Sequence, residues 1–170
     1  PWGRILSKLK LHTYINNIKI RKMALPISAV EVGPWGGEDG AQWMFRLNVG
    51  ERLTNIKICG TSSGVYSIQF TYMDINNISR DSPVYGGPGG EVYEISLDEK
   101  EVITGISGTF VLNYSTHITI QSLSFQTNQD TYGYGVPKGN TFSLPVPKGN
   151  FVGFFGKCGD RLDSIGAMLA

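Results

Sequence analysis

The sequence has few of the features that mark a membrane protein, a metalloenzyme or a disulfide-stabilised domain. Only two cysteines and two histidines occur in 170 residues, and no run of about 18 apolar residues predicts a transmembrane helix. Charged residues make up 17% of the chain and the formal net charge is +1, so no strong field points to nucleic acid or an anionic membrane. We therefore expect a soluble protein with an uncharged partner, without nucleic acid, membrane insertion, cofactor or metal.

The cysteines, Cys59 and Cys158, are too few to form a disulfide framework. A single domain of ordinary size buries enough apolar surface to fold without covalent links. Free thiols in a reducing compartment are therefore favoured, although a disulfide remains an alternative. Since no compact apolar stretch with a cleavage site follows the basic start, we expect a cytoplasmic or nucleocytoplasmic location.

Residues 1–24 contain no acidic residue. Their charged residues are all basic: Arg4, Lys8, Lys10, Lys19, Arg21 and Lys22. This composition differs from the rest of the chain and predicts a basic extension outside the main fold, with one domain over residues 25–170. An organellar transit peptide is the alternative interpretation. The Asn16-Asn17 pair and the nearby isoleucines make a poor amphipathic helix, so the extension is favoured.

Helical periodicity is also missing, because no segment beyond Met23 sustains a 3.6-residue apolar period over three turns. The remaining sequence alternates apolar and polar residues in short runs, as in residues 55–59, 66–72 and 118–125. Such runs are typical of half-buried strands. The 22 glycines indicate many tight reversals. We therefore expect an all-β fold, with Trp35 and Trp43 packed in its core.

The glycine-rich loops and the strand signals recur together and indicate an internal repeat. The segment 33–40 has a counterpart in 84–90 and a weaker one in 132–135, and each is followed by a serine flanked by apolar alternation. Those serine segments are Tyr66-Ser67-Ile68, Gln121-Ser122-Leu123 and Asp163-Ser164-Ile165. Each of three small sheets would leave one apolar face unburied, and packing the three sheets around one shared core buries all of these faces. The repeat therefore predicts a threefold prism.

The most informative segment is the polar turn 159–166, which places two carboxylates three residues apart beside a glycine. Backbone N–H donors and anionic acceptors side by side match adjacent hydroxyl groups of a sugar. The closing stretch 152–166, which contains this turn, resembles the jacalin-related lectins together with Gly33-Pro34-Trp35-Gly36-Gly37, the loop 85–90 and the run 106–109. The resemblance covers about residues 27–170. The resemblance implies β-prism I, with three four-stranded Greek-key sheets and pseudo-threefold symmetry.

The resemblance also implies one monosaccharide site at one end of the prism. Asp163 would accept hydrogen bonds from two sugar hydroxyls, and Asp160 would add a second carboxylate contact. The turn that begins at Gly159 would supply the backbone N–H groups of Asp160 and Arg161 as donors. The side chain of Arg161 is expected to point to solvent.

Two further positions follow from the same resemblance. Gly40 would offer its backbone N–H to another hydroxyl, and His117 matches a residue that borders the site and would touch a second sugar unit. Because the chain continues through the first loop and Asp160 and Arg161 are not aromatic, we expect the mannose/glucose class rather than galactose. A second site is not expected, because Thr61 and Gly64 stand where it would need carboxylates. The loop 86–90 is then a structural remnant rather than a binding surface.

Two other functions compete with that of a lectin. A glycosidase needs acid and base on opposite sides of the scissile bond, whereas Asp160 and Asp163 share one short turn, so we expect no enzyme. The stronger alternative is a β-prism protein-interaction module with vestigial sugar binding. If the chain is a lectin, a single site should bind in the millimolar range, about 4 kcal/mol. Useful avidity then predicts a homodimer or a larger homo-oligomer.

Overall fold

The computed structural model describes residues 25–113, 116–148 and 150–170, and this part of the chain contains strands and no helix. The all-β prediction is confirmed, and no helix in the described residues is long and apolar enough to cross a membrane. The predicted extension 1–24 lies outside the described residues. The strands are β1 (Val30–Gly36), β2 (Ala41–Arg46), β3 (Arg52–Thr61), β4 (Gly64–Met73), β5 (Ser79–Asp81), β6 (Tyr85–Gly86), β7 (Glu91–Ser96), β8 (Ile103–Asn113), β9 (His117–Thr127), β10 (Thr131–Tyr134), β11 (Asn140–Pro145), β12 (Phe151–Cys158) and β13 (Leu162–Leu169).

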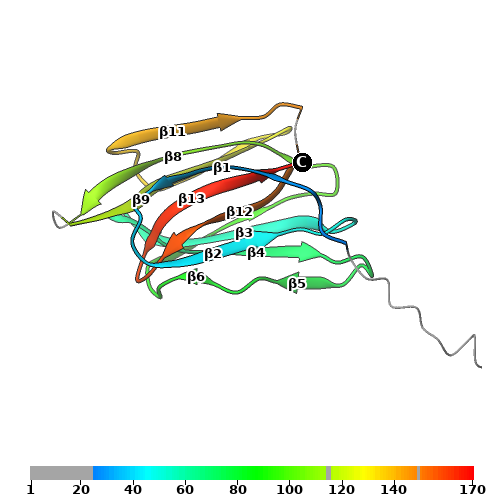
Figure 1. The fold of residues 1–170 in the computed structure, drawn as a ribbon, viewed down its shortest axis with the longest axis horizontal. Helices are drawn as coiled ribbons and strands as arrows, with labels where there is room; N and C mark the ends of the chain where they lie inside the picture. Colours follow the sequence, from blue (N-terminus) through cyan, green and yellow to red (C-terminus); the bar gives the residue numbers. More distant parts are fainter. Residues whose placement is uncertain (1–24, 114–115, 149) are drawn as a thin grey trace, which may run out of the picture.

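The strands form three antiparallel sheets that share one topology. Their orders are β1-β13-β12-β2, β10-β9-β8-β11 and β5-β4-β3-β7, and β6 joins the last by pairing with β4 beside β5. In each sheet two outer strands flank a central hairpin, which is a Greek-key order. The outer strands follow the hairpin in the chain in the second and third sheets, whereas β1 and β2 precede the hairpin β12–β13 in the first. The first sheet combines β1 and β2 with the C-terminal hairpin β12–β13, so both ends of the domain meet in it (Figure 1). The predicted β-prism I is confirmed.

The prism core follows from the alternation along the strands. In β3, Ile56 and Ile58 are fully buried while Lys57 between them is partly exposed, and Ile68 and Phe70 repeat the pattern on β4. One apolar face per sheet therefore points into a common interior. The predicted packing of the two tryptophans is confirmed, because Trp43 is 6% exposed within this core and Trp35 packs against it. The Trp35 ring stacks on Phe142 at 4.9 Å between centroids.

The threefold repeat appears in the backbone as three equivalent close contacts. In each sheet a glycine with positive φ lies over the backbone just before a buried serine of the neighbouring strand. A Cβ atom at these glycines would come within 2.3, 2.1 and 2.6 Å of the preceding carbonyl oxygen, so only glycine fits. The pairs are Gly36 with Ser164, Gly86 with Ser67, and Gly135 with Ser122. The weak third copy, at residues 132–135, is thus a true member of the repeat.

Both cysteines are free thiols and lie half-buried in equivalent strands, β3 and β12. Burial raises the pKa of the Cys158 thiol above its usual range, which keeps it protonated at neutral pH. The predicted free thiols are confirmed. The β1–β2, β8–β9 and β12–β13 turns gather at the end of the prism away from the C terminus (Figure 1).

Candidate functional site

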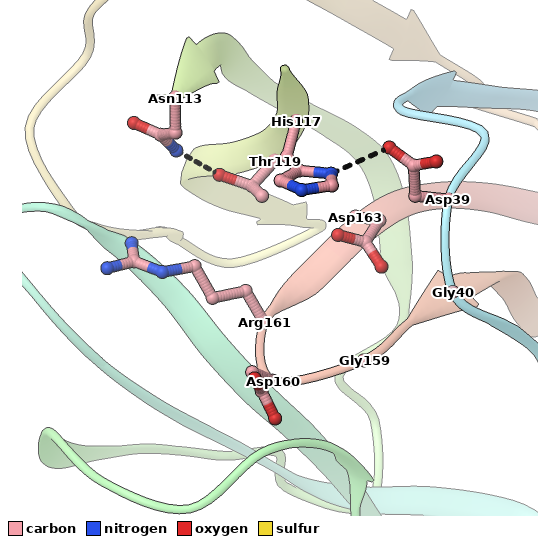
Figure 2. A pocket seen from close by; sticks show the side chains of 9 residues that line it. All are labelled: Asp39, Gly40, Asn113, His117, Thr119, Gly159, Asp160, Arg161 and Asp163. Carbon is pink, nitrogen blue, oxygen red and sulfur yellow. Dashed lines mark hydrogen bonds and ion pairs between the residues drawn. The ribbon is translucent and has the colours of Figure 1, made fainter. Parts of the chain in front are cut away.

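A pocket of about 330 Å³ opens at the end of the prism where three turns converge (Figure 2). Its volume lies at the small end of the range for ligand pockets, which suits a ligand the size of one sugar. The pocket is lined by all six residues that the sequence analysis predicted as sugar-binding residues, and by three others. The lining residues are Asp39, Gly40, Asn113, His117, Thr119, Gly159, Asp160, Arg161 and Asp163.

Asp163 and Gly40 form the floor of this pocket. Asp163 lies at the start of β13, and its backbone carbonyl accepts a hydrogen bond of 2.8 Å from the N–H of Gly37 in the β1–β2 turn. That bond holds the first turn against the last strand. A Cβ atom on Gly40 would lie 2.4 Å from Oδ2 of Asp163, and φ there is +78°. Only glycine allows the backbone to approach the carboxylate this closely.

Asp163 is a buried residue, with 7% of its surface exposed. Its pKa is raised to about 6, first by burial and then by the neighbouring carboxylates of Asp39 and Asp160, against the opposing influence of His117 and Lys157. Within the described ranges its side chain makes no hydrogen bond. An ionised, buried carboxylate without a donor is costly, so hydroxyl donors of a ligand would compensate it directly.

Backbone donors lie beside this acceptor. The N–H groups of Gly40, Asp160 and Arg161 make no hydrogen bond to any described residue, although the turn itself is closed by Gly159 N–H donating to the Arg161 carbonyl at 2.9 Å. Unpaired backbone N–H groups at an exposed turn are available to a ligand oxygen. The pocket therefore combines one strong acceptor with several donors, the set that neighbouring hydroxyl groups require.

The side chains of Asp160 and Arg161 lie differently from expectation. The Asp160 carboxylate is directed away from Asp163 (Figure 2), so in this arrangement its side chain does not complete a two-carboxylate pair. The prediction that the Arg161 side chain points to solvent is wrong. Its guanidinium donates to the Ser63 carbonyl at 2.7 Å and to the Tyr66 hydroxyl at 3.3 Å, because the β3–β4 turn lies directly beside the terminal turn.

The sequence reasoning did not find Asp39, Asn113 and Thr119. Asp39 pairs with Nδ1 of His117 at 3.1 Å and thereby joins the β1–β2 turn to the start of β9 (Figure 2). The Asn113 side chain donates to the Thr119 hydroxyl on the facing strand. A signal for Asp39 was present, since it directly precedes Gly40. The other two flank the same turn as His117 but are separated from the carboxylates by more than 40 residues of sequence.

The turn that corresponds to the site in the first repeat is self-contained. Oγ1 of Thr61 lies 2.8 Å from Oγ of Ser63, and no carboxylate is present in residues 60–64. The middle glycine loop packs on the site instead of forming another one, because a Cβ atom on Gly87 would come within 2.4 Å of the Asp160 carbonyl oxygen. This arrangement agrees with the expected structural role of the loop 86–90.

Within the described residues no group of three or more His, Cys, Asp or Glu side chains is arranged to hold a metal ion.

Comparison with known proteins identifies the architecture. The family model described as the Jacalin-like lectin domain matches residues 32–168. An agglutinin from Castanea crenata is 42% identical over 143 residues, 81% of this chain and 45% of that protein. A mannose/glucose-specific lectin from Parkia pendula is 36% identical over 149 residues, 83% of this chain and 32% of that protein. The chain thus spans less than half the length of these curated relatives.

Other similar proteins are matched over nearly their whole length. The solved structure of a mannose binding jacalin related lectin from Ananas comosus has a TM-score of 0.74 and 31% identity, covering 83% of this chain and 96% of that chain. A galactose-specific lectin from Morus indica is 35% identical over 148 residues, 84% of this chain and 92% of that protein. Lectins bind carbohydrate and are not enzymes, so the prediction that the chain is not an enzyme is confirmed. With the three Greek-key sheets, the pocket at their end and a family model that spans most of the described residues, the chain belongs to the jacalin-related lectins.

Proposed function

We propose that this chain binds glycans with mannose or glucose residues, through one non-catalytic site per domain at the pocket around Asp163. The observation that carries the proposal is the contact between the Asp163 carboxylate and the bare backbone of Gly40. One hexose ring would give two hydroxyl hydrogens to Asp163 and accept from the N–H groups of Gly40, Asp160 and Arg161. His117, at the rim, would contact the next sugar unit.

The choice of mannose or glucose rests on the chain itself and on its relatives. The terminal turn has Asp160 and Arg161 where an aromatic platform would favour galactose, and the chain continues through the first turn. The lectins from Parkia pendula and Ananas comosus are named for mannose, whereas the one from Morus indica is named for galactose. A direct competition between the two sugars therefore decides the specificity.

The proposed site is weak when it acts alone. Hydrogen bonds to the sugar replace hydrogen bonds to water, so a few of them give roughly millimolar affinity, about 4 kcal/mol. Joining sites in a homo-oligomer raises the apparent affinity by about 10² to 10⁴ without new contacts. We therefore propose a homodimer or larger assembly. The free thiols support a cytoplasmic or nucleocytoplasmic location.

The test is isothermal titration of the protein with methyl α-mannoside, methyl α-glucoside and methyl β-galactoside, for the native chain and for Asp163→Ala. We expect mannoside and glucoside to bind, galactoside to bind at least tenfold more weakly, and the variant to lose binding with an unchanged far-UV spectrum. A preference for galactoside would overturn the specificity. Absence of binding to all three by the native chain would favour the protein-interaction module.

A further inference from the structure

The side chain of Arg161 reaches out of the sugar pocket and ends on another sheet. Its Nη1 donates to the Ser63 carbonyl at 2.7 Å, and its Nη2 lies 3.3 Å from both Oγ of Ser63 and the hydroxyl of Tyr66. The guanidinium carbon also lies 4.6 Å from the centroid of the Tyr66 ring. The side chain thus contacts the β3–β4 turn, 98 residues away in sequence. None of these contacts directs the guanidinium toward Asp163.

We propose that Arg161 is a positioning residue that braces the terminal turn against the β3–β4 turn, so that the backbone donors of Asp160 and Arg161 are held where the sugar needs them. The inference rests on the proposed function for what the donors bind. A planar guanidinium that is hydrogen-bonded and stacked at the same time has a fixed direction. Lysine, a single point charge on a flexible stem, cannot reproduce both contacts.

The terminal turn needs external support because little holds it from within. Its internal backbone closure is one hydrogen bond, from Gly159 N–H to the Arg161 carbonyl. On the other side Gly87 packs on the Asp160 backbone, where any Cβ atom would come within 2.4 Å of the carbonyl oxygen. The turn is therefore clamped between the middle glycine loop and the guanidinium contact. Preorganised donors lose less conformational entropy when a ligand binds.

The bracing surface is the counterpart of the site in the first repeat. Thr61 and Gly64 occupy the places of Asp160 and Asp163, so this turn lacks the acceptors that a sugar needs. Gly64 has a φ of +132°, and a Cβ atom there would lie 3.2 Å from Nη1 of Arg161. A side chain at position 64 would therefore press against the guanidinium. The turn thus supports the site around Asp163 and does not form a site of its own.

The test is a double-mutant cycle on affinity for methyl α-mannoside, with the native chain, Arg161→Ala, Tyr66→Ala and the double variant. We expect Arg161→Ala to weaken binding about tenfold and Tyr66→Ala to weaken it less, because the hydrogen bond to the Ser63 carbonyl survives in that variant. The double variant should be little worse than Arg161→Ala, since Tyr66 acts through the guanidinium. Arg161→Lys should recover only part of the loss. Arg80→Ala, which removes an exposed ion pair outside the pocket, serves as the matched control and should bind normally.

Direct contact between the Arg161 side chain and the sugar predicts a different result. The losses from Arg161→Ala and Tyr66→Ala would then add, and additive losses overturn the proposal. Amide hydrogen exchange of the Gly159 N–H, which donates to the Arg161 carbonyl and closes the turn, separates the brace from the proposed function when it is measured without sugar. Arg161→Ala should speed exchange there while the core strands stay protected, whether or not the native chain binds mannoside. Unchanged exchange in the turn would refute the brace.

Discussion

Replacing Asp163 by asparagine should make the protein more stable at neutral pH while it abolishes sugar binding. The side chain keeps its shape, but the charge that the pocket buries is lost. Asp163 is 7% exposed and makes no hydrogen bond within the described residues. Its ionised form is therefore disfavoured by the fold, which is the usual origin of a raised carboxyl pKa.

The size of the effect follows from linkage. The pKa rises from 3.8 to about 6, and a difference of about two between folded and unfolded pKa values corresponds to at most about 3 kcal/mol, which water in the open pocket reduces by screening. Because the folded pKa is the higher one, the folded state binds the proton more tightly. The native chain therefore gains stability as the pH falls through about 6 toward 4 and loses it again as the pH rises. Asparagine avoids this penalty but leaves its own amide to be satisfied, so we expect a gain of about 1 to 3 kcal/mol at pH 7.5.

The assay is urea unfolding of both proteins at pH 7.5, 6 and 4.5, with methyl α-mannoside titration in parallel. Taking the difference between the two proteins at each pH cancels the other titrating groups. The stability advantage of Asp163→Asn should be largest at pH 7.5 and shrink to nearly nothing at pH 4.5. If the variant is less stable at pH 7.5, or its advantage does not change with pH, the reasoning about a desolvated carboxylate is refuted.

Three further predictions concern the same pocket. In the native chain, mannoside affinity should fall by half or more near pH 6, because a protonated Asp163 accepts fewer hydrogen bonds; a flat profile between pH 7.5 and 5 would contradict it. Asp39→Asn should move that midpoint to lower pH and His117→Ala should move it to higher pH, because Asp39 raises and His117 lowers the pKa of Asp163; shifts in the same direction would rule out this electrostatic assignment. Gly40→Ala should weaken binding at least tenfold and cost about 1 to 2 kcal/mol of stability. Gly133→Ala, whose added Cβ atom would come no nearer than 4.0 Å to the hydroxyl oxygen of Ser124, should change neither. Equal behaviour of the two glycine variants would disprove the close approach at Gly40.

The fold was predictable because its information is local and repeated. Alternation along single strands marks the faces that pack inward, and the glycine at each repeat reports a backbone contact that no other residue allows. Gly36 and Gly86 have clear counterparts in the sequence, and Gly135, the weakest match, has the same geometry. Because the glycine motif recurs, even its weakest copy, at residues 132–135, could be recognised as part of the repeat. The split of one edge strand into β5 and β6 carries no such signal, and the sequence did not indicate it.

The site was predictable where a residue acts through its own turn, and not where it acts across the prism. Gly40 and Asp163 could be predicted because a glycine in a turn and a carboxylate beside a glycine are recognisable in a short segment of sequence. The direction of the Arg161 side chain depends on which turn lies beside it, and that turn belongs to a different sheet. The pairing of Asp39 with His117 spans 78 residues and likewise exists only in the folded chain.

The three central hairpins have the same path but end in turns with different roles, and this divergence explains why one pocket is enough. The β12–β13 turn carries Asp163 and the free backbone donors. His117, beside the β8–β9 turn, lines one side of the pocket. The β3–β4 turn accepts a hydrogen bond from the guanidinium of Arg161. Because the fold is fixed by the buried faces of the sheets, residues at the turns are free to change without loss of the core. Placing carboxylates at Thr61 and Gly64 would therefore not simply create a second site, because Gly64 lies beside the guanidinium of Arg161 and a charged side chain there would draw the guanidinium from its present contacts.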